Sequence, residues 1–141
     1  MNLSSYLTRL NTKEGKVFDP VRKKWLTLLP EEMVRQTLIL YLTEEVNCSI
    51  RRMAVEKSIR IHDQLKRFDL VYHDSAMKPL LLVECKSPST PLIQDVLEQA
   101  VWYNYEIRAP YLLLSNGHEA LWYRVDPIAK SYERLSEPPK L

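Results

Sequence analysis

Two apolar stretches, Arg67-Phe-Asp-Leu-Val-Tyr-His73 and Pro79-Leu-Leu-Leu-Val-Glu-Cys-Lys86, decide the fold of this sequence. Both are rich in branched aliphatic and aromatic residues, which favour β-strands. The turn-like segment Asp74-Ser-Ala-Met-Lys78 separates them, a loop length typical of a hairpin. The sequence therefore predicts two paired antiparallel strands at the centre of the protein.

The turn also fixes the expected register of this hairpin. A turn centred between residues 76 and 77 gives the pairs Val71–Leu82, His73–Leu80 and Asp69–Glu84. Because side chains alternate across a strand, we expect Asp69, Glu84 and Lys86 on one face. The other face is expected to carry the apolar residues Phe68, Leu70, Tyr72, Leu81, Val83 and Cys85. A slip of one residue would undo this arrangement.

Two opposed carboxylates at the ends of apolar strands repel each other unless a cation lies between them. Lys86, two residues beyond Glu84, supplies part of that charge. A divalent metal such as Mg²⁺, which binds through one or two carboxylates and water, would supply the rest. The alternative is a structural salt bridge at the sheet edge, since Glu-x-Lys is common by chance. Both interpretations stay open on these residues alone.

The remaining chain predicts an α/β fold, with a central mixed β-sheet flanked by helices in the order αβββαβ. Apolar residues at helical spacing predict a first helix from residue 31 to about 45. We expect a kinked strand over 49–60, and a second helix from Pro91 to about Ile107. The last two predicted strands, 111–115 and 119–125, flank a turn at Asn116-Gly117.

The 141 residues fit one domain. We expect an N-terminal arm over 1–16 (a short helix or a loose segment), the domain over 17–126 and an irregular tail over 127–141. Residues 1–67 hold 13 Lys/Arg against 8 Asp/Glu, and residues 68–141 hold 7 against 10. A basic half suits a phosphate backbone, but an unevenly solvated surface explains it equally well.

Several classes of protein are excluded or disfavoured. The two glycines of the sequence cannot build a Walker A or Rossmann phosphate loop. Two cysteines without a CxxC pair indicate reduced thiols. Nothing reaches the roughly 18 apolar residues of a membrane span, so we expect a cytoplasmic protein with no membrane association.

Asp69 followed by Glu84-Cys85-Lys86 resembles the bipartite signature of PD-(D/E)XK nucleases. The wider pattern resembles the N-terminal nuclease domain of type I restriction enzyme R subunits over residues 17 to 126. The motifs that carry this resemblance are Phe18-Asp-Pro20, Pro30-Glu-Glu-Met-Val-Arg-Gln36, Arg67-Phe-Asp69, Glu84-Cys-Lys86, Gln99-Ala-Val-Trp-Tyr103 and Leu114-Ser-Asn-Gly117. Phe68 stands where the superfamily name has proline. Without the helicase motor, we expect a free-standing nuclease-like domain.

The resemblance implies roles for the hairpin residues. Asp69 and Glu84 would bind Mg²⁺, or Mn²⁺, with the backbone carbonyl of Cys85 as a third ligand. Lys86 would orient the attacking water and stabilise charge on the phosphate. The Cys85 side chain is expected to pack in the core.

The helices supply the other implied site residues. Glu31 rather than Glu32 is the expected first-helix acid, because Glu31 shares the apolar face and Glu32 points aside; the alternative is a favourable charge at a helix N-terminus. Gln99 would order metal or water, whereas Tyr103 would hold a DNA phosphate. Without the resemblance, this i,i+4 pair is more simply core lining. Arg35 and Arg67 are further candidate nucleic-acid contacts.

The function predicted from these residues is a Mg²⁺-dependent DNA endonuclease domain. The alternative is a nuclease-like fold that binds DNA or assembles with other proteins without catalysis. Expected partners are DNA, and either a second copy of the chain or other restriction or repair subunits.

Overall fold

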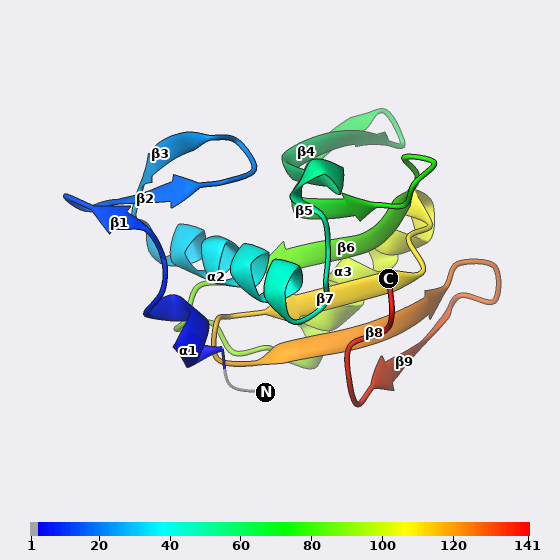
Figure 1. Ribbon diagram of the computed structural model, residues 1–141. Coiled ribbons are helices and arrows are strands. Elements are labelled where there is room, and N and C mark those ends of the chain that lie inside the picture. Colours follow the sequence, from blue (N-terminus) through cyan, green and yellow to red (C-terminus); the bar gives the residue numbers. More distant parts are fainter. Residues whose placement is uncertain (1–2) are drawn as a thin grey trace.

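The computed structural model describes residues 3–141 and has a mixed α/β fold around a six-stranded sheet (Figure 1). The strands lie side by side in chain order, and every neighbouring pair is antiparallel except β6 and β7. Helix α3 (Gln94–Ile107) makes the crossover between these two parallel strands. The strands are β4 (Met53–Ile61), β5 (Gln64–His73), β6 (Pro79–Cys85), β7 (Tyr111–Ser115), β8 (Ala120–Asp126) and β9 (Ser131–Leu135).

The two long helices cover opposite faces of the sheet (Figure 1). Helix α2 (Pro30–Glu44) begins with a proline, whose fixed φ suits the first helical position. Its apolar stripe packs on one face with Leu70, Leu81 and Val83. Helix α3 packs on the other face, where Val71 and Leu82 are fully buried. The central strands are therefore apolar on both sides, as expected for a covered sheet.

A second, three-stranded antiparallel sheet precedes α2 and lies beside its first turns (Figure 1). The expected N-terminal arm contains a short helix, α1 (Ser4–Leu7), together with the first strand of this sheet. The Asp19 carboxylate accepts hydrogen bonds from the backbone N–H groups of Val21 and Arg22, which closes the turn between the last two strands of this sheet. The three strands are β1 (Thr12–Lys13), β2 (Lys16–Asp19) and β3 (Lys24–Thr27).

The predicted register of the central hairpin is confirmed over three residues of β5. Leu70 pairs with Val83, Val71 with Leu82 and Tyr72 with Leu81. The predicted pair His73–Leu80 is wrong: the register shifts after Tyr72, and His73 pairs with Pro79. The irregularity adjoins the loop where Met77 has φ 62° and the Asp74 side chain accepts backbone N–H groups.

Strands β4 and β5 both change face at the level of Glu56 and Asp69. Leu70 packs on the α2 side, yet Phe68 packs on the α3 side, although residues two apart normally share a face. The predicted placement of Phe68 beside Leu70 is therefore wrong. Glu56 has φ 53° and lies opposite Asp69, between the pairs that flank it. This local distortion explains why Phe68 and Leu70 lie on different faces of the sheet. It also supports the expectation of a kink in the strand that contains Glu56.

Several boundaries differ from the sequence prediction. The strand predicted over 49–60 begins with a short 3-10 helix, Ile50–Arg52, and β4 itself starts at Met53. Strand β5 starts at Gln64 rather than at Arg67. Helix α3 begins at Gln94 rather than at Pro91. The expected irregular tail contains β9, which pairs along β8 from residue 131 to 135. Among residues 3–141, no helix is long and apolar enough to cross a membrane.

Candidate active site

The expected site residues meet where β5 and β6 pass the start of α2. A cavity of about 260 Å³ lies there, and its lining is almost entirely polar. Asp69 and Glu84 both line it, together with Lys86. The other lining residues are Glu31, Arg35, Glu56, Arg67, Phe68 and Cys85. The hairpin thus brings the predicted acidic pair and lysine to one opening.

Asp69 is held by hydrogen bonds to both of its carboxylate oxygens. Arg35 donates from Nη2 to Oδ1 at 3.2 Å, and the Cys85 backbone N–H donates to Oδ2 at 2.8 Å. The second bond crosses from β5 to β6, so it fixes the carboxylate relative to the strand that carries Glu84. The Cys85 side chain is buried in the α2 cluster, as predicted, and burial raises the pKa of its thiol.

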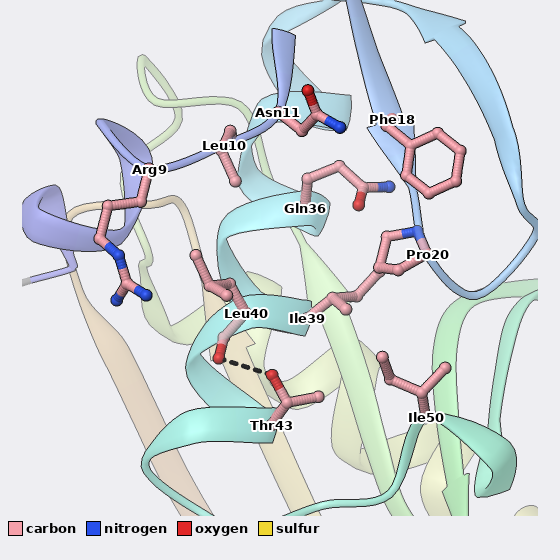
Figure 2. Close-up of a pocket in the computed structure, with 10 residues that line it drawn as sticks. All are labelled: Arg9, Leu10, Asn11, Phe18, Pro20, Gln36, Ile39, Leu40, Thr43 and Ile50. Atoms are coloured by element: carbon pink, nitrogen blue, oxygen red, sulfur yellow. Dashed lines mark hydrogen bonds between the residues drawn. The ribbon is translucent and has the colours of Figure 1, made fainter.

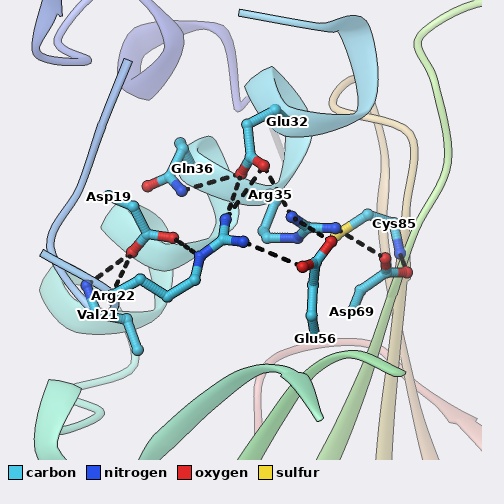
Figure 3. A network of polar contacts seen from close by, with 9 residues as sticks. All are labelled: Asp19, Val21, Arg22, Glu32, Arg35, Gln36, Glu56, Asp69 and Cys85. Carbon is cyan, nitrogen blue, oxygen red and sulfur yellow. Dashed lines mark hydrogen bonds and ion pairs between the residues drawn. The ribbon is translucent and has the colours of Figure 1, made fainter. Parts of the chain in front are cut away.

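A network of ion pairs connects Asp69 to the N-terminal sheet (Figure 3). Arg35 also binds Glu32 at 2.8 Å, and Arg22 binds the same carboxylate at 3.1 Å. Arg22 then continues to Asp19 at 2.6 Å. Both guanidinium groups further contact Glu56. Four carboxylates therefore share two guanidinium groups, which leaves an excess of negative charge beside the cavity.

Glu84 has the least satisfied carboxylate of the site. Its Oε1 atom is buried and has no hydrogen-bond partner among the described residues. Burial raises the pKa of Glu84 to about 8, and the negative charge of Asp69 adds to this shift. The positive charges of Lys86 and Lys66 oppose it. A group in this state binds either a proton or another cation near neutral pH.

Glu84 and Lys86 also line a second, smaller cavity on the α3 side of the sheet. Its volume is about 30 Å³, and Gln99 and Tyr103 of α3 face it together with Lys66. The Lys66 Nζ atom lies 4.5 Å from the centre of the Tyr103 ring. Helix α3 therefore places both residues of its predicted i,i+4 pair at a cavity that Glu84 also lines.

The side chains at this site supply only some of the ligands that a divalent cation needs. No cluster of three or more His, Cys, Asp or Glu side chains with metal-binding geometry occurs within residues 3–141. The pair Asp69 and Glu84 supplies two carboxylates, and Mg²⁺ commonly binds to one or two carboxylates and completes its shell with water. The unpartnered Glu84 oxygen and the shared negative charge fit such an ion.

The other predicted residues have distinct surroundings. Glu31 lines the cavity from the solvent side, and exposed Arg67 lines it from β5. The expectation that Glu32 points aside is wrong, because its half-buried carboxylate binds Arg22 and Arg35. The side chain of Arg35 is 7% exposed, which favours a role in holding Asp69 over contact with a phosphate.

Sequence reasoning missed three residues of this region, namely Arg22, Glu56 and Lys66. Arg22 and Glu56 come from segments that the sequence places far from the hairpin, so only the tertiary fold reveals them. The placement of Lys66 could have been predicted from the sequence, because it lies two residues before Phe68 on the same strand and so shares its face.

A separate cavity, also of about 260 Å³, lies away from the carboxylates and from the two cavities described above, between the N-terminal segment and α2 (Figure 2). Its wall is mainly apolar, with Phe18, Ile39 and Leu40 among the lining residues. It has no pair of acidic groups and therefore no comparable means of binding a cation.

The fold and site together define a mixed α/β domain with a paired-carboxylate cavity. Residues 30–139 match the family described as Type I restriction enzyme R protein N terminus (HSDR_N). The match covers most of the chain, so the protein belongs to this family. The matched range begins at α2, and the three-stranded N-terminal sheet lies outside it.

A solved structure shares the fold. It is a fragment assigned as an HsdR subunit of a type I restriction enzyme from Vibrio vulnificus YJ016, with a TM-score of 0.59 and 19% sequence identity. The similarity covers 79% of this chain and 24% of that chain, so this chain corresponds to a small part of that fragment. No curated protein matches the sequence significantly.

Proposed function

We propose that this chain is a nuclease domain of the PD-(D/E)XK type that hydrolyses phosphodiester bonds in DNA with Mg²⁺ or Mn²⁺. The observation that carries the proposal is the shared cavity of Asp69, Glu84 and Lys86, in which a buried Glu84 oxygen lacks a hydrogen-bond partner among residues 3–141. Family membership supports a role in restriction, since the family is defined on restriction R proteins.

Each residue has a physical task in this proposal. Asp69, fixed by Arg35 and the Cys85 N–H, and Glu84 would hold the cation, and the Cys85 carbonyl would add a ligand. When bound, the ion supplies Lewis-acid stabilisation of the phosphate and lowers the pKa of water. Lys86 would orient the water and stabilise negative charge on the phosphoryl oxygens. Because the pKa of Glu84 is about 8, its proton must leave before it can bind the ion.

Residues around the cation site complete the proposal. Gln99 would position water at the α3 side of Glu84, and Glu31 would contribute from the solvent side of the cavity. Exposed Arg67 would contact the DNA backbone. Association with other restriction subunits, or with a second copy of the chain, and a cytoplasmic location belong to the same proposal.

One observation favours a second function, a DNA-binding or assembly module without catalysis. Both oxygens of Asp69 already accept hydrogen bonds, and Glu84 is mainly protonated near neutral pH. If the cation does not displace that proton, the site is a structural one and the domain serves its partners only by binding.

Cleavage of supercoiled plasmid and of single-stranded DNA with Mg²⁺ or Mn²⁺ tests the proposal. We expect the wild type to cut, Glu84→Ala to be inactive, and Lys86→Ala to lose roughly 10²–10³-fold. Lys78→Ala is the matched control, because Lys78 is an exposed lysine of the β5–β6 turn. Equal cutting by Glu84→Ala would exclude this site, and a wild type that binds DNA without cutting it would favour the second function.

A further inference from the structure

Lys66 lies beside the proposed cleavage site and has no role in the function proposed above. It lines the small cavity that Glu84 and Lys86 share with α3. No ion pair of the described residues involves either lysine. The cavity therefore holds two lysines and one carboxylate, an excess of positive charge on this side of Glu84. Such a charge suits an anion, in contrast to the acidic network on the α2 side.

The ring of Tyr103 holds Lys66 in this position. The Nζ atom lies 4.5 Å from the ring centre, a geometry in which the ring face attracts the cation. Tyr103 is itself braced by an edge-to-face contact with Phe68, at 6.3 Å between ring centres. Phe68 reaches that ring only because β5 changes face at Asp69. The distortion of the strand thus brings Lys66, Phe68 and Tyr103 together next to Glu84.

The volume of the cavity limits where an anion can bind. The cavity measures about 30 Å³, much less than the 260 Å³ of the acidic cavity. A phosphate group at its mouth is within reach of a flexible lysine, which binds it as a point charge. Lys66 itself is half-buried rather than buried, so its side chain remains accessible to solvent at the mouth of the cavity.

We propose that Lys66 binds a backbone phosphate of the nucleic acid at the α3 side of Glu84, and that Tyr103 is a positioning residue that acts through its ring. This rests on the proposed function for its substrate. It differs from the expectation that Tyr103 itself holds the phosphate, a contact that would use its hydroxyl group. The two accounts separate cleanly, because one needs the ring and the other needs the hydroxyl group.

The test compares variants in two assays, DNA cleavage with Mn²⁺ and duplex binding in EDTA over a series of NaCl concentrations. Lys66→Met should lower cleavage by roughly 10- to 100-fold and should reduce the salt dependence of binding by about one phosphate contact. Lys66→Arg should restore the salt dependence. Lys130→Met is the matched control, because Lys130 also lies over an α3 ring, that of Trp102, at 6.0 Å and outside both polar cavities.

Tyrosine variants test the positioning role. Tyr103→Phe keeps the ring and should cost less than about threefold, whereas Tyr103→Leu should approach the loss of Lys66→Met. Melting curves establish that each variant is folded. A Tyr103→Phe variant as weak as Tyr103→Leu would overturn the role of the ring, and a Lys66→Met variant with the salt dependence of Lys130→Met would overturn the phosphate contact.

The outcome for the wild type separates this inference from the proposed function. If the wild type binds duplex DNA without cutting it, hydrolysis fails, and the salt dependence still decides the role of Lys66. If it cuts and Lys66→Met cuts equally well, the function stands and the inference fails. A wild type that neither binds nor cuts DNA overturns both.

Discussion

The two carboxylates of the cavity, Asp69 in the middle of β5 and Glu84 near the end of β6, are in opposite states. Asp69 on β5 has a guanidinium on one oxygen and a backbone N–H on the other. Glu84 on β6 keeps a buried oxygen that has no hydrogen-bond partner in the described part of the chain, and its pKa rises to about 8. Both oxygens of the Asp69 carboxylate therefore accept hydrogen bonds before any cation binds, whereas one oxygen of the Glu84 carboxylate does not.

This difference indicates how the site is arranged for a cation. A fully satisfied pair would form a structural contact, and an unsatisfied pair would repel strongly. Holding Asp69 rigid fixes one ligand position, while Glu84 exchanges a proton for a metal ion. The unpartnered oxygen costs stability, which is the expected pattern where function is kept at the expense of the fold.

Removing the partner of Asp69 should have the largest effect on stability. Arg35→Gln leaves Asp69 without its cation and leaves Glu32 with Arg22 alone, and breaking a buried pair costs about 3–5 kcal/mol. Asp69 would then resemble Glu84. Chemical unfolding measures the loss, and Arg124→Gln is the control, since its pair with Glu133 is exposed and worth at most about 1 kcal/mol. Equal, small effects would show that the network does not hold Asp69.

Adding a cation should stabilise the protein through Glu84. A ligand that binds only the folded state at 100 times its Kd contributes about 2.7 kcal/mol, or roughly 5–10 °C in melting temperature for a domain of this size. Mn²⁺ or Mg²⁺ should produce this rise in the wild type. Glu84→Gln should melt higher than the metal-free wild type and should lose most of the response. A structural salt bridge predicts a destabilised Glu84→Gln variant and no effect of metal.

The pH dependence of the metal-free protein tests the ionisation of Glu84 without any added ion. The pKa of Glu84 rises from 4.5 to about 8 on folding, so the folded state binds this proton more tightly than the unfolded chain. Its contribution to stability is therefore complete below about pH 4.5 and is lost as the pH rises through about 8. Unfolding measured from pH 5 to 9 should show the wild type losing stability relative to Glu84→Gln. Parallel curves would mean that Glu84 ionises normally.

Regular elements of the fold could be predicted from the sequence because their side-chain patterns are simple. Strand β7 begins and ends at the predicted residues 111 and 115, and the hairpin register holds from Leu70 to Tyr72. The apolar residues that predict the first helix, namely Val34, Leu38, Tyr41, Leu42 and Val46, all lie in the core. Strand β9 could not be predicted in this way, since Ser131–Leu135 is largely exposed and has no apolar face.

The site could be predicted in its members but not in its surroundings. Strand alternation predicts Asp69, Glu84 and Lys86 on a common face, and all three line one cavity. The change of face at Asp69 does not follow from alternation, because it depends on Glu56, a glutamate with φ 53° that no local rule anticipates. Arg35 looks like a surface residue of a helix, and only the packed sheet shows that its guanidinium reaches Asp69.

The most direct test of the account is the number of protons that Mn²⁺ displaces at pH 7. Calorimetry in buffers of different ionisation enthalpy measures this quantity for the wild type and for Glu84→Gln. Because a carboxylic acid must lose its proton before it binds the ion, we expect release of about one proton from the wild type and almost none from the variant. Binding without proton release in the wild type, or equal release in both proteins, would contradict the assignment of Glu84 as the carboxylate that exchanges its proton for the metal.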